Sequence, residues 1–361
     1  MKNCFYDIVR QGVPNAPFVD IEPVLLEEDL DEKDFLSLLS PLAAGYLEEM
    51  AGKANLLTLR NFGRVISLYA PLYLSNYCEN ECLYCGFSRN NSIKRKKLGI
   101  PELRAEVESI AATGIGHILL LTGESRKESP LSYIKECARE MRDVFSSISV
   151  EIYPVTTEEY RELVGAGVDG LTLYQETYDE ELYRLLHGTG PKRDYFFRLE
   201  GPQRACKAGM RQANLGALLG LSDWRKEIFF LGMHARWLMR NYPDVEIGVS
   251  LPRFKKHEGA FSCANAVSDK EFAQILVALR LFLPRASISI STRESRIFRE
   301  NLIGLGVTRM SAGSHTEVGG YASVDKTEGQ FDIEDSSTVE EVKAMIIRRG
   351  YQPVLKDWQA I

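Results

Sequence analysis

Strand-like runs occur eight times between residues 66 and 312, and amphipathic, helix-like segments lie between them. The strand-like runs are 66–77, 117–123, 149–155, 171–176, 212–221, 246–251, 286–292 and 307–312. The helix-like segments are 101–113, 130–146, 157–165, 194–209, 224–241, 268–283 and 295–304. Alternating strands and helices predict a parallel sheet, and the eightfold count favours closure as a (β/α)8 barrel of the TIM type, an α/β fold.

Two further regions flank the predicted barrel. Residues 22–62 have apolar residues spaced by three and four, which indicates helices, and residues 1–20 look irregular. We therefore predict an N-terminal helical extension over 1–62, the barrel over 63–314, and a C-terminal loop with a closing helix over 315–361. An open doubly wound sheet is the alternative, but no G-x-G-x-x-G follows the first predicted strand.

Three cysteines follow the first predicted strand at the spacing C-x3-C-x2-C, namely Cys78, Cys82 and Cys85. Thiolates bind iron–sulfur clusters, usually four to a cluster. The remaining cysteines, Cys4, Cys137, Cys206 and Cys263, lie at no short spacing that would nominate a fourth ligand. We predict a [4Fe–4S] cluster held by three thiolates, in which the fourth iron is open to reaction.

A zinc site or a disulfide framework fits these cysteines less well. A zinc ribbon uses four ligands, usually in two pairs, and no second pair follows. A disulfide framework belongs to secreted proteins, whereas the first residues lack the apolar segment of a signal peptide. The sequence contains no stretch of about 18 apolar residues, so we predict no membrane span. Seven cysteines without a disulfide pattern, and a cluster that oxygen would damage, predict a protein of the reducing cytoplasm.

The charge of the chain excludes one class of function. The net charge is −6, which argues against a protein that grips nucleic acid. The basic run 94–97 stands alone without interleaved aromatic residues, so a solvated face is the preferred interpretation. Docking of an acidic electron donor is the second interpretation.

Polar residues gather where the predicted strands end, which is where barrel enzymes carry their chemistry. They are Thr122, Glu124, Glu151, Tyr153, Tyr174, Gln175, Glu176, Ser291, Arg293, Ser311, Ser314 and His315. If the strands are correct, all of these side chains share one end of the barrel.

The cysteine spacing, with the aromatic Tyr84 before Cys85, is similar to that of the radical S-adenosylmethionine (SAM) superfamily. Longer segments resemble the ThiH family of tyrosine lyases (2-iminoacetate synthases) in thiamine biosynthesis. They are 40–48, 71–76, 85–88, 93–96, 122–124, 174–178, 216–220, 291–295 and 350–358. The related hydrogenase maturase HydG carries further cluster cysteines after its barrel, and no cysteine follows Cys263 here.

The resemblance implies a complete reaction. SAM would bind the open iron and be cleaved to methionine and a 5′-deoxyadenosyl radical, which takes a hydrogen from the amino group of L-tyrosine. Cleavage of the Cα–Cβ bond would give 2-iminoacetate (dehydroglycine) and p-cresol. Thiazole synthase (ThiG) is the expected partner for the first product, and flavodoxin or ferredoxin the expected electron donor. Because dehydroglycine hydrolyses readily, we expect a closed, water-poor site.

The resemblance also suggests residues for each ligand. For SAM these are Tyr84, Glu124, Gln175, Glu176, Arg198, Gly216 and Gly220: the carboxylate of Glu176 suits the ribose diol, and the glycines would let adenine approach the backbone. For tyrosine, Arg293 suits the carboxylate, because arginine forms two parallel hydrogen bonds with it. Ser311 and Ser314 would hold the amino group, and Tyr73 and Tyr153 would orient the phenol. A structural Arg293–Glu294 pair and glycines used for packing are the alternatives.

Three other functions remain open. A lyase acting on another aromatic amino acid, like HydG or tryptophan lyase, would keep the same site. A transferase like biotin synthase would need a second cluster inside the barrel, whereas Cys137 and Cys206 are predicted on helices. An electron-transfer protein would have no need of Arg293 and Ser311 in a cavity. Analysis of the products separates these functions.

Overall fold

The computed structural model describes residues 5–14, 18–257, 261–323 and 325–356. Cys4 and Trp358 lie outside these ranges. No helix in the described ranges is both long and apolar enough to cross a membrane.

Eight parallel strands close into a barrel because β1 pairs with both β2 and β8. The strands are β1 (Val65–Ser75), β2 (His117–Thr122), β3 (Ser147–Glu151), β4 (Gly170–Glu176), β5 (Gln212–Ala217), β6 (Glu246–Ser250), β7 (Ser287–Ile290) and β8 (Arg309–Ser311). The predicted closed (β/α)8 barrel is confirmed. A ninth strand near the C-terminus, β9 (Gln352–Val354), was not predicted and pairs with the start of β1.

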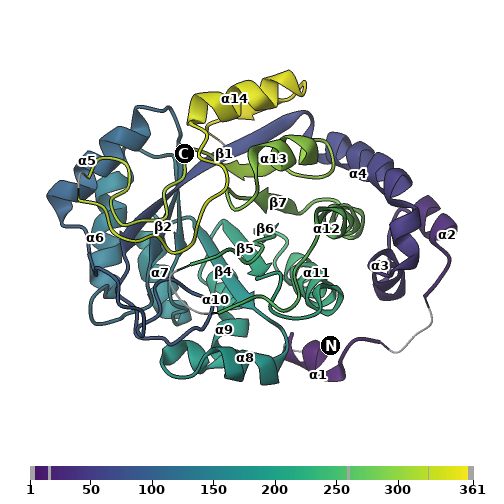
Figure 1. The fold of residues 1–361 in the computed structure, drawn as a ribbon, viewed down its shortest axis with the longest axis horizontal. Coiled ribbons are helices and arrows are strands. Elements are labelled where there is room, and N and C mark those ends of the chain that lie inside the picture. The colour runs from purple at the N-terminus through teal and green to yellow at the C-terminus, as the bar shows by residue number, and fades with distance from the viewer. Residues whose placement is uncertain (1–4, 15–17, 258–260, 324, 357–361) are drawn as a thin grey trace.

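Helices surround the barrel (Figure 1). They are α5 (Ile100–Ala111), α6 (Leu131–Met141), α7 (Thr157–Gly165), α8 (Glu180–Leu186), α9 (Tyr195–Leu199), α10 (Gly201–Lys207), α11 (Trp224–Asn241), α12 (Asp269–Phe282) and α13 (Arg296–Leu302). The predicted helix 194–209 is divided at Glu200, because Pro202 in the next turn has no N–H to continue the first helix. The helix α8 and a short 3₁₀ helix, η2 (Pro191–Arg193), were missed between β4 and β5.

The third and fifth predicted strands extend furthest beyond their observed ends. The third spans Ser147–Glu151, so it begins and ends earlier than the predicted 149–155. The fifth ends at Ala217 rather than at 221, and the chain beyond it turns at Gly220, where φ is +115°. In both cases an apolar or branched run continues into the loop, and periodicity alone does not show where sheet pairing stops.

The N-terminal helices pack on the outside of the barrel, and the first of them lies apart from the others, at the lower edge of Figure 1. They are α1 (Tyr6–Gln11), α2 (Ile21–Leu26), α3 (Glu32–Leu38), η1 (Leu42–Gly45) and α4 (Leu47–Phe62). The ring of Phe35 on α3 stacks on that of Phe282 on α12, with 4.0 Å between ring centroids. The helix α1 corrects the expectation that residues 1–20 are irregular. The division into three domains remains a prediction.

The segment between β8 and α14 (Val339–Arg348) crosses the mouth of the barrel, as Figure 1 shows in yellow-green. An ion pair between the fully buried Arg299 on α13 and Asp335 attaches this segment to the barrel. Burial opposes ionisation of Asp335, but the Arg299 guanidinium holds the pKa of that carboxyl below its usual value. Arg299 also donates to the Ser311 carbonyl, so one side chain joins α13, β8 and the covering segment.

We expect Asp335→Asn to lower the free energy of unfolding by about 3–5 kcal/mol, because it leaves a buried arginine without its counter-ion. Asp332→Asn, an exposed position in the same segment, is the matched control and should change it by about 0.5 kcal/mol or less. Anaerobic denaturation followed by circular dichroism measures both. Equal midpoints for the two variants would contradict the structural role of this pair.

Candidate active site

The three predicted cluster ligands lie together. Cys78, Cys82 and Cys85 follow β1 and line one cavity of about 480 Å³ at the carboxyl ends of the strands. The Glu79 N–H donates to the Glu124 carbonyl over 3.0 Å, and the Leu83 N–H donates to the Leu186 carbonyl over 3.1 Å. The cysteine loop is therefore fixed to the end of β2 and to α8.

The basic run 94–97 also holds this loop. Arg95 donates hydrogen bonds to the carbonyls of Asn76, Phe87 and Ser88 at distances of 2.6–2.9 Å. Lys96 pairs with Glu102 at 3.3 Å. The interpretation of this run as only a solvated face is therefore wrong for Arg95, whose guanidinium braces the backbone on either side of the cysteines.

The cysteines fit a cluster better than a single ion. Burial raises the pKa of Cys78 to about 11 and the pKa of Cys82 well above its usual value. Bound iron would reverse this, because a coordinating thiol is deprotonated. No group of three or more His, Cys, Asp or Glu within the described ranges is placed to hold one metal ion. A cluster makes a different demand, because each thiolate binds a separate iron atom.

Two acids and two bases form a buried network beside the cysteines. Arg198 donates to Glu124 over 2.8 Å, and Lys192 donates to Glu176 over 2.7 Å. The Asn80 side chain donates to Glu124 over 2.9 Å. Burial opposes the charged forms, but the paired cations keep the pKa values of Glu124 and Glu176 below their usual range. All four groups are therefore charged inside the cavity.

Glu176 has an unusual backbone. Its φ of +71° makes it the one non-glycine residue with positive φ among the described residues. The pairing of β4 with β5 is irregular between Tyr174 and Glu176, which indicates a β-bulge. Bulges redirect side chains near active sites, and strained backbone clusters at functional sites. The bulge places the Glu176 carboxylate in the cavity.

Among the residues predicted for SAM, the structure brings Glu124, Glu176 and Arg198 into the cysteine cavity. Tyr84 lines an adjoining cavity of about 480 Å³ and forms a 2.7 Å hydrogen bond with His187. Gln175 is buried and lines neither of these cavities; its side-chain N–H₂ has no hydrogen-bond partner among the described residues. The geometry gives Gln175 no place beside a ligand of the cysteine cavity.

The two predicted glycines lie in closely packed surroundings. A Cβ atom at Gly216 would lie 2.5 Å from the ring of Tyr174, and one at Gly220 would lie 2.5 Å from the sulfur of Cys263. Gly220 also has a φ of +115°, which favours glycine. The packing alternative is therefore sufficient to explain both glycines, and the approach of adenine to their backbone stays a prediction.

Arg293 lies in a loop after β7 and lines two cavities. Its guanidinium carbon lies 3.3 Å from the centre of the Phe331 ring, and it donates one hydrogen bond to the Arg253 carbonyl over 3.3 Å. It forms no ion pair within the described ranges. The alternative Arg293–Glu294 pair is wrong, because the buried Glu294 accepts from Arg253 instead, at 2.9 and 3.0 Å.

A second cavity of about 460 Å³ joins the remaining substrate candidates. Tyr73, Arg293, Ser311 and Ser314 all line it. Tyr73 donates to the Gln330 side chain over 2.8 Å, and the Ser311 hydroxyl accepts from the Thr292 N–H over 3.2 Å. The buried hydroxyl of Ser314 has no hydrogen-bond partner among the described residues. This cavity therefore contains the unsatisfied hydroxyl of Ser314 together with the charged side chains of Arg293 and Glu151.

Tyr153 and His315 lie outside this arrangement. The Tyr153 hydroxyl donates to the Ser129 carbonyl over 2.9 Å, and Arg126 covers its ring. His315 pairs with Glu317 at 3.3 Å and lines neither the cysteine cavity nor the second cavity. Tyr153 was predicted to orient the phenol because it lies on the third predicted strand, but its side chain contacts the loop between β2 and α6.

Sequence reasoning missed Lys192, Asn80, Gln330 and Phe331. Lys192 lies in the stretch Gly188-Thr-Gly-Pro-Lys192, a possible signal of a loop that approaches a ligand. Gln330 and Phe331 belong to the segment that covers the mouth of the barrel, and the Gly86 N–H donates to the Gln330 carbonyl over 3.1 Å. No local pattern in the segment indicates that Gln330 and Phe331 reach the site, because the path of the segment depends on its long-range contacts.

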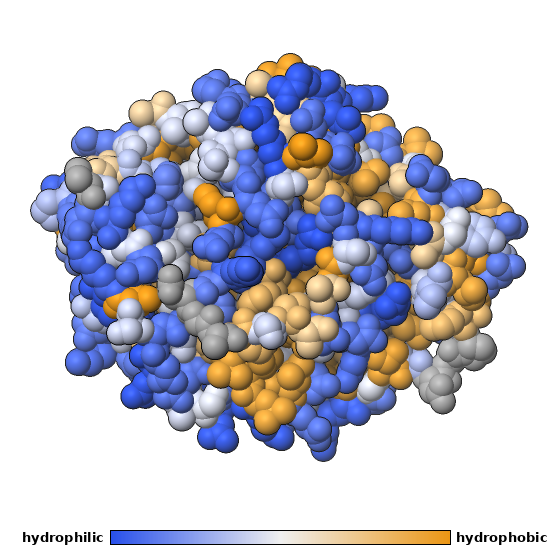
Figure 2. Space-filling model, viewed as in Figure 1, coloured by the Kyte–Doolittle hydropathy of each residue, from blue (hydrophilic) through white to orange (hydrophobic). Residues whose placement is uncertain are grey.

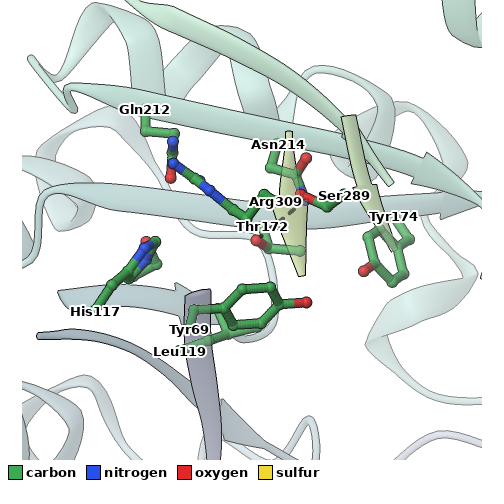
Figure 3. Close-up of a pocket in the computed structure, with 10 residues that line it drawn as sticks. Tyr69, His117, Leu119, Thr172, Tyr174, Gln212, Asn214, Ser289 and Arg309 are labelled. Atoms are coloured by element: carbon green, nitrogen blue, oxygen red, sulfur yellow. Dashed lines mark hydrogen bonds between the residues drawn. The ribbon is translucent and has the colours of Figure 1, made fainter. Parts of the chain in front are cut away.

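A further, polar chamber of about 290 Å³ lies deeper in the barrel (Figure 3). Its lining residues include His117, Thr172, Asn214, Ser289 and Arg309, where TIM barrels usually carry branched apolar side chains. The rings of Tyr69 and Tyr174 border both this chamber and the second cavity.

The deep chamber bears on the biotin synthase alternative, which needs extra ligands inside the barrel. Arg309 does lie inside, but it pairs with Glu246 at 3.4 Å, and the described lining residues include no cysteine. Cys137 and Cys206 are buried on α6 and α10, as predicted. The described chamber does not provide the thiolates for a second cluster.

Comparison with known proteins agrees with this geometry. Residues 72–231 match the Radical SAM superfamily, and residues 250–352 match the Biotin and Thiamin Synthesis associated domain. The 2-iminoacetate synthase of Escherichia coli (strain K12) is 40% identical over 356 residues, which cover 98% of this chain and 94% of that protein.

Solved structures give the same result for the fold. The crystal structure of HydG, a maturase of the [FeFe]-hydrogenase, superposes with a TM-score of 0.89 at 31% identity, covering 96% of this chain and 79% of that chain. Methylornithine synthase (PylB) has a TM-score of 0.74 at 22% identity, covering 92% of this chain and 96% of that chain, which supports the fold alone. The chain therefore belongs to the 2-iminoacetate synthase family of the radical SAM superfamily.

Proposed function

We propose that the protein is the 2-iminoacetate synthase of thiamine biosynthesis, which cleaves the Cα–Cβ bond of L-tyrosine into 2-iminoacetate and p-cresol. The observation that carries this proposal is the 40% identity to a 2-iminoacetate synthase over 98% of the chain. The site supports it, because a cavity lined by three thiols adjoins one lined by Arg293.

Cys78, Cys82 and Cys85 would hold the [4Fe–4S] cluster. When bound, the cluster and SAM supply the 5′-deoxyadenosyl radical that removes a hydrogen atom from the substrate. The network beside the cysteines offers both signs of charge to the charged groups of SAM. Arg198 and Lys192 suit its carboxylate, and Glu176 suits the ribose diol or the ammonium.

Arg293 would bind the carboxylate of tyrosine. A free carboxylate is costly to bury unless it is paired, and a guanidinium offers two parallel hydrogen bonds. Stacking on Phe331 fixes the plane of that guanidinium. Because Phe331 belongs to the segment over the barrel mouth, that segment would help to exclude water from the reactive imine.

The electron donor would dock beside Cys82. Leu83 in the cysteine loop is 52% exposed and Leu185 on α8 is 73% exposed. Figure 2 shows an apolar area on the lower half of the visible face, where α8 lies in Figure 1. Exposed apolar patches often mark interaction sites. Because Leu83 belongs to the cysteine loop, flavodoxin or ferredoxin docked on this surface would lie beside the cluster. Thiazole synthase as the acceptor of 2-iminoacetate, and a cytoplasmic location, remain predictions.

The proposal predicts the products of one reaction. Anaerobically reconstituted protein with reductant, SAM and L-tyrosine should form p-cresol and 5′-deoxyadenosine in comparable amounts, measured by liquid chromatography. Phenylalanine and tryptophan in parallel reactions test the alternative that another aromatic amino acid is the substrate. Formation of 5′-deoxyadenosine without p-cresol would overturn the assignment to tyrosine.

Arg293→Lys should keep the cluster but lower the p-cresol formed per 5′-deoxyadenosine by about tenfold or more. Lysine supplies charge without the planar fork, and a misplacement of substrate by about 1 Å can cost on the order of a hundredfold in rate. Arg296→Lys is the matched control, since that side chain is 44% exposed and pairs with Glu341 at 3.6 Å. An unchanged product ratio in Arg293→Lys would show that this arginine does not position the substrate.

A further inference from the structure

Glu151 is the last residue of β3. It lines the cysteine cavity, the second cavity and the adjoining cavity that Tyr84 lines. It therefore stands where the three spaces meet. Among the described residues that line the second cavity, Glu151 is the one acid and Arg293 the one base. Their opposite charges face a common space of about 460 Å³.

Glu151 differs from the other two acids of the site. Glu124 and Glu176 are each paired with a cation, whereas Glu151 has no hydrogen bond or ion pair within the described ranges. Burial, reinforced by the charge of Glu176, raises the pKa of Glu151 to about 7. A half-buried carboxylate without a partner is costly, and a cation brought by a ligand would offset that cost.

The surroundings of Glu151 come from several elements. The charged and titratable groups that face it are Glu176, Lys192, Arg198, Arg293, Tyr69, Tyr73 and Tyr174. Lys192 and Arg198 are already engaged by Glu124 and Glu176. Arg293 is the remaining cation, and its stacking on Phe331 leaves the guanidinium at the wall of the same cavity.

An α-amino acid carries a carboxylate and an ammonium group on one carbon atom, which matches a base and an acid that line one cavity. Resting on the proposed function, we propose that Glu151 binds the amino group of L-tyrosine opposite Arg293 and accepts the proton that its ammonium group loses. The N–H bond breaks with its electron pair left on nitrogen, and an O–H bond forms on the carboxylate. The neutral amine then presents its N–H bonds toward the cysteine cavity, which Glu151 also lines.

Two substrate analogues, each lacking one charged group of tyrosine, distinguish binding of the amino group by Glu151 from a general disturbance of the cavity. We call them half-substrates. Tyramine has the amino group without the carboxylate, and 3-(4-hydroxyphenyl)propionate has the carboxylate without the amino group. Equilibrium dialysis of each with the anaerobic, SAM-loaded holoenzyme measures affinity without turnover. Glu151→Gln should weaken tyramine binding by about 10- to 100-fold, because it removes a charged hydrogen-bond partner, and should change binding of the propionate by about twofold or less. Arg293→Lys should weaken binding of the propionate and should change tyramine binding by about twofold or less.

Glu246→Gln is the matched control, because it removes one carboxylate at the opposite end of the barrel, where Glu246 pairs with Arg211 at 3.1 Å. It should leave both half-substrates bound as in the wild type. Equal weakening of both half-substrates in Glu151→Gln, unchanged tyramine binding, or a wild-type enzyme that binds neither would overturn the proposal. The p-cresol assay of the wild type tests the proposed function separately, so the two failures are distinguishable.

The pH dependence gives a second readout. Proton acceptance requires the ionised carboxylate, so kcat/KM for tyrosine should rise with pH as Glu151 ionises. Glu151→Gln should lose that rising limb and lower kcat/KM by about a hundredfold. Glu151→Asp should restore the limb at a reduced rate. A rising limb that persists in Glu151→Gln would contradict proton acceptance by this residue.

Discussion

The pairing of β1 with both β2 and β8 is the constraint on which the site depends. Closure brings the carboxyl ends of eight strands to one rim, so residues far apart in sequence line common cavities. The cysteine loop after β1, Glu124 after β2, Glu151 at the end of β3 and Arg293 after β7 come together in this way. The site is therefore a consequence of topology, while its chemistry belongs to a few side chains.

Charge organises those side chains. Four buried charges beside the cysteines are balanced in two pairs, Glu124 with Arg198 and Glu176 with Lys192. Buried ion pairs contribute little net stability, because desolvation offsets their attraction, so their value here is in fixing geometry for a charged ligand. Arg293 has no such internal counter-ion within the described ranges. The contrast between balanced and unbalanced charges separates the proposed SAM side of the rim from the proposed substrate side.

Much of this arrangement could be predicted from the sequence. Periodicity and the count of repeats indicated the barrel, and the cysteine spacing indicated that three thiols share one cavity, because both depend on local patterns. Gln175 and Tyr153 lie outside the predicted arrangement, because a strand end does not reveal which way a side chain points. The bulge at Glu176 has no clear signature in the sequence. Lys192 and Phe331 were missed because they reach the site through an insertion and a covering segment, whose paths are set by tertiary packing.

The central claim is that the amino nitrogen of L-tyrosine lies beside Glu151, where the second cavity meets the cysteine cavity in which the radical would form. Its N–H hydrogens exchange with solvent, whereas its C–H hydrogens do not. A reaction in D₂O, with the 5′-deoxyadenosine analysed by mass spectrometry, therefore reads the position of the substrate directly. The account predicts one deuterium in the 5′-deoxyadenosine from D₂O, and none in H₂O from tyrosine deuterated at Cα and Cβ. Deuterium transferred from Cα or Cβ would contradict it.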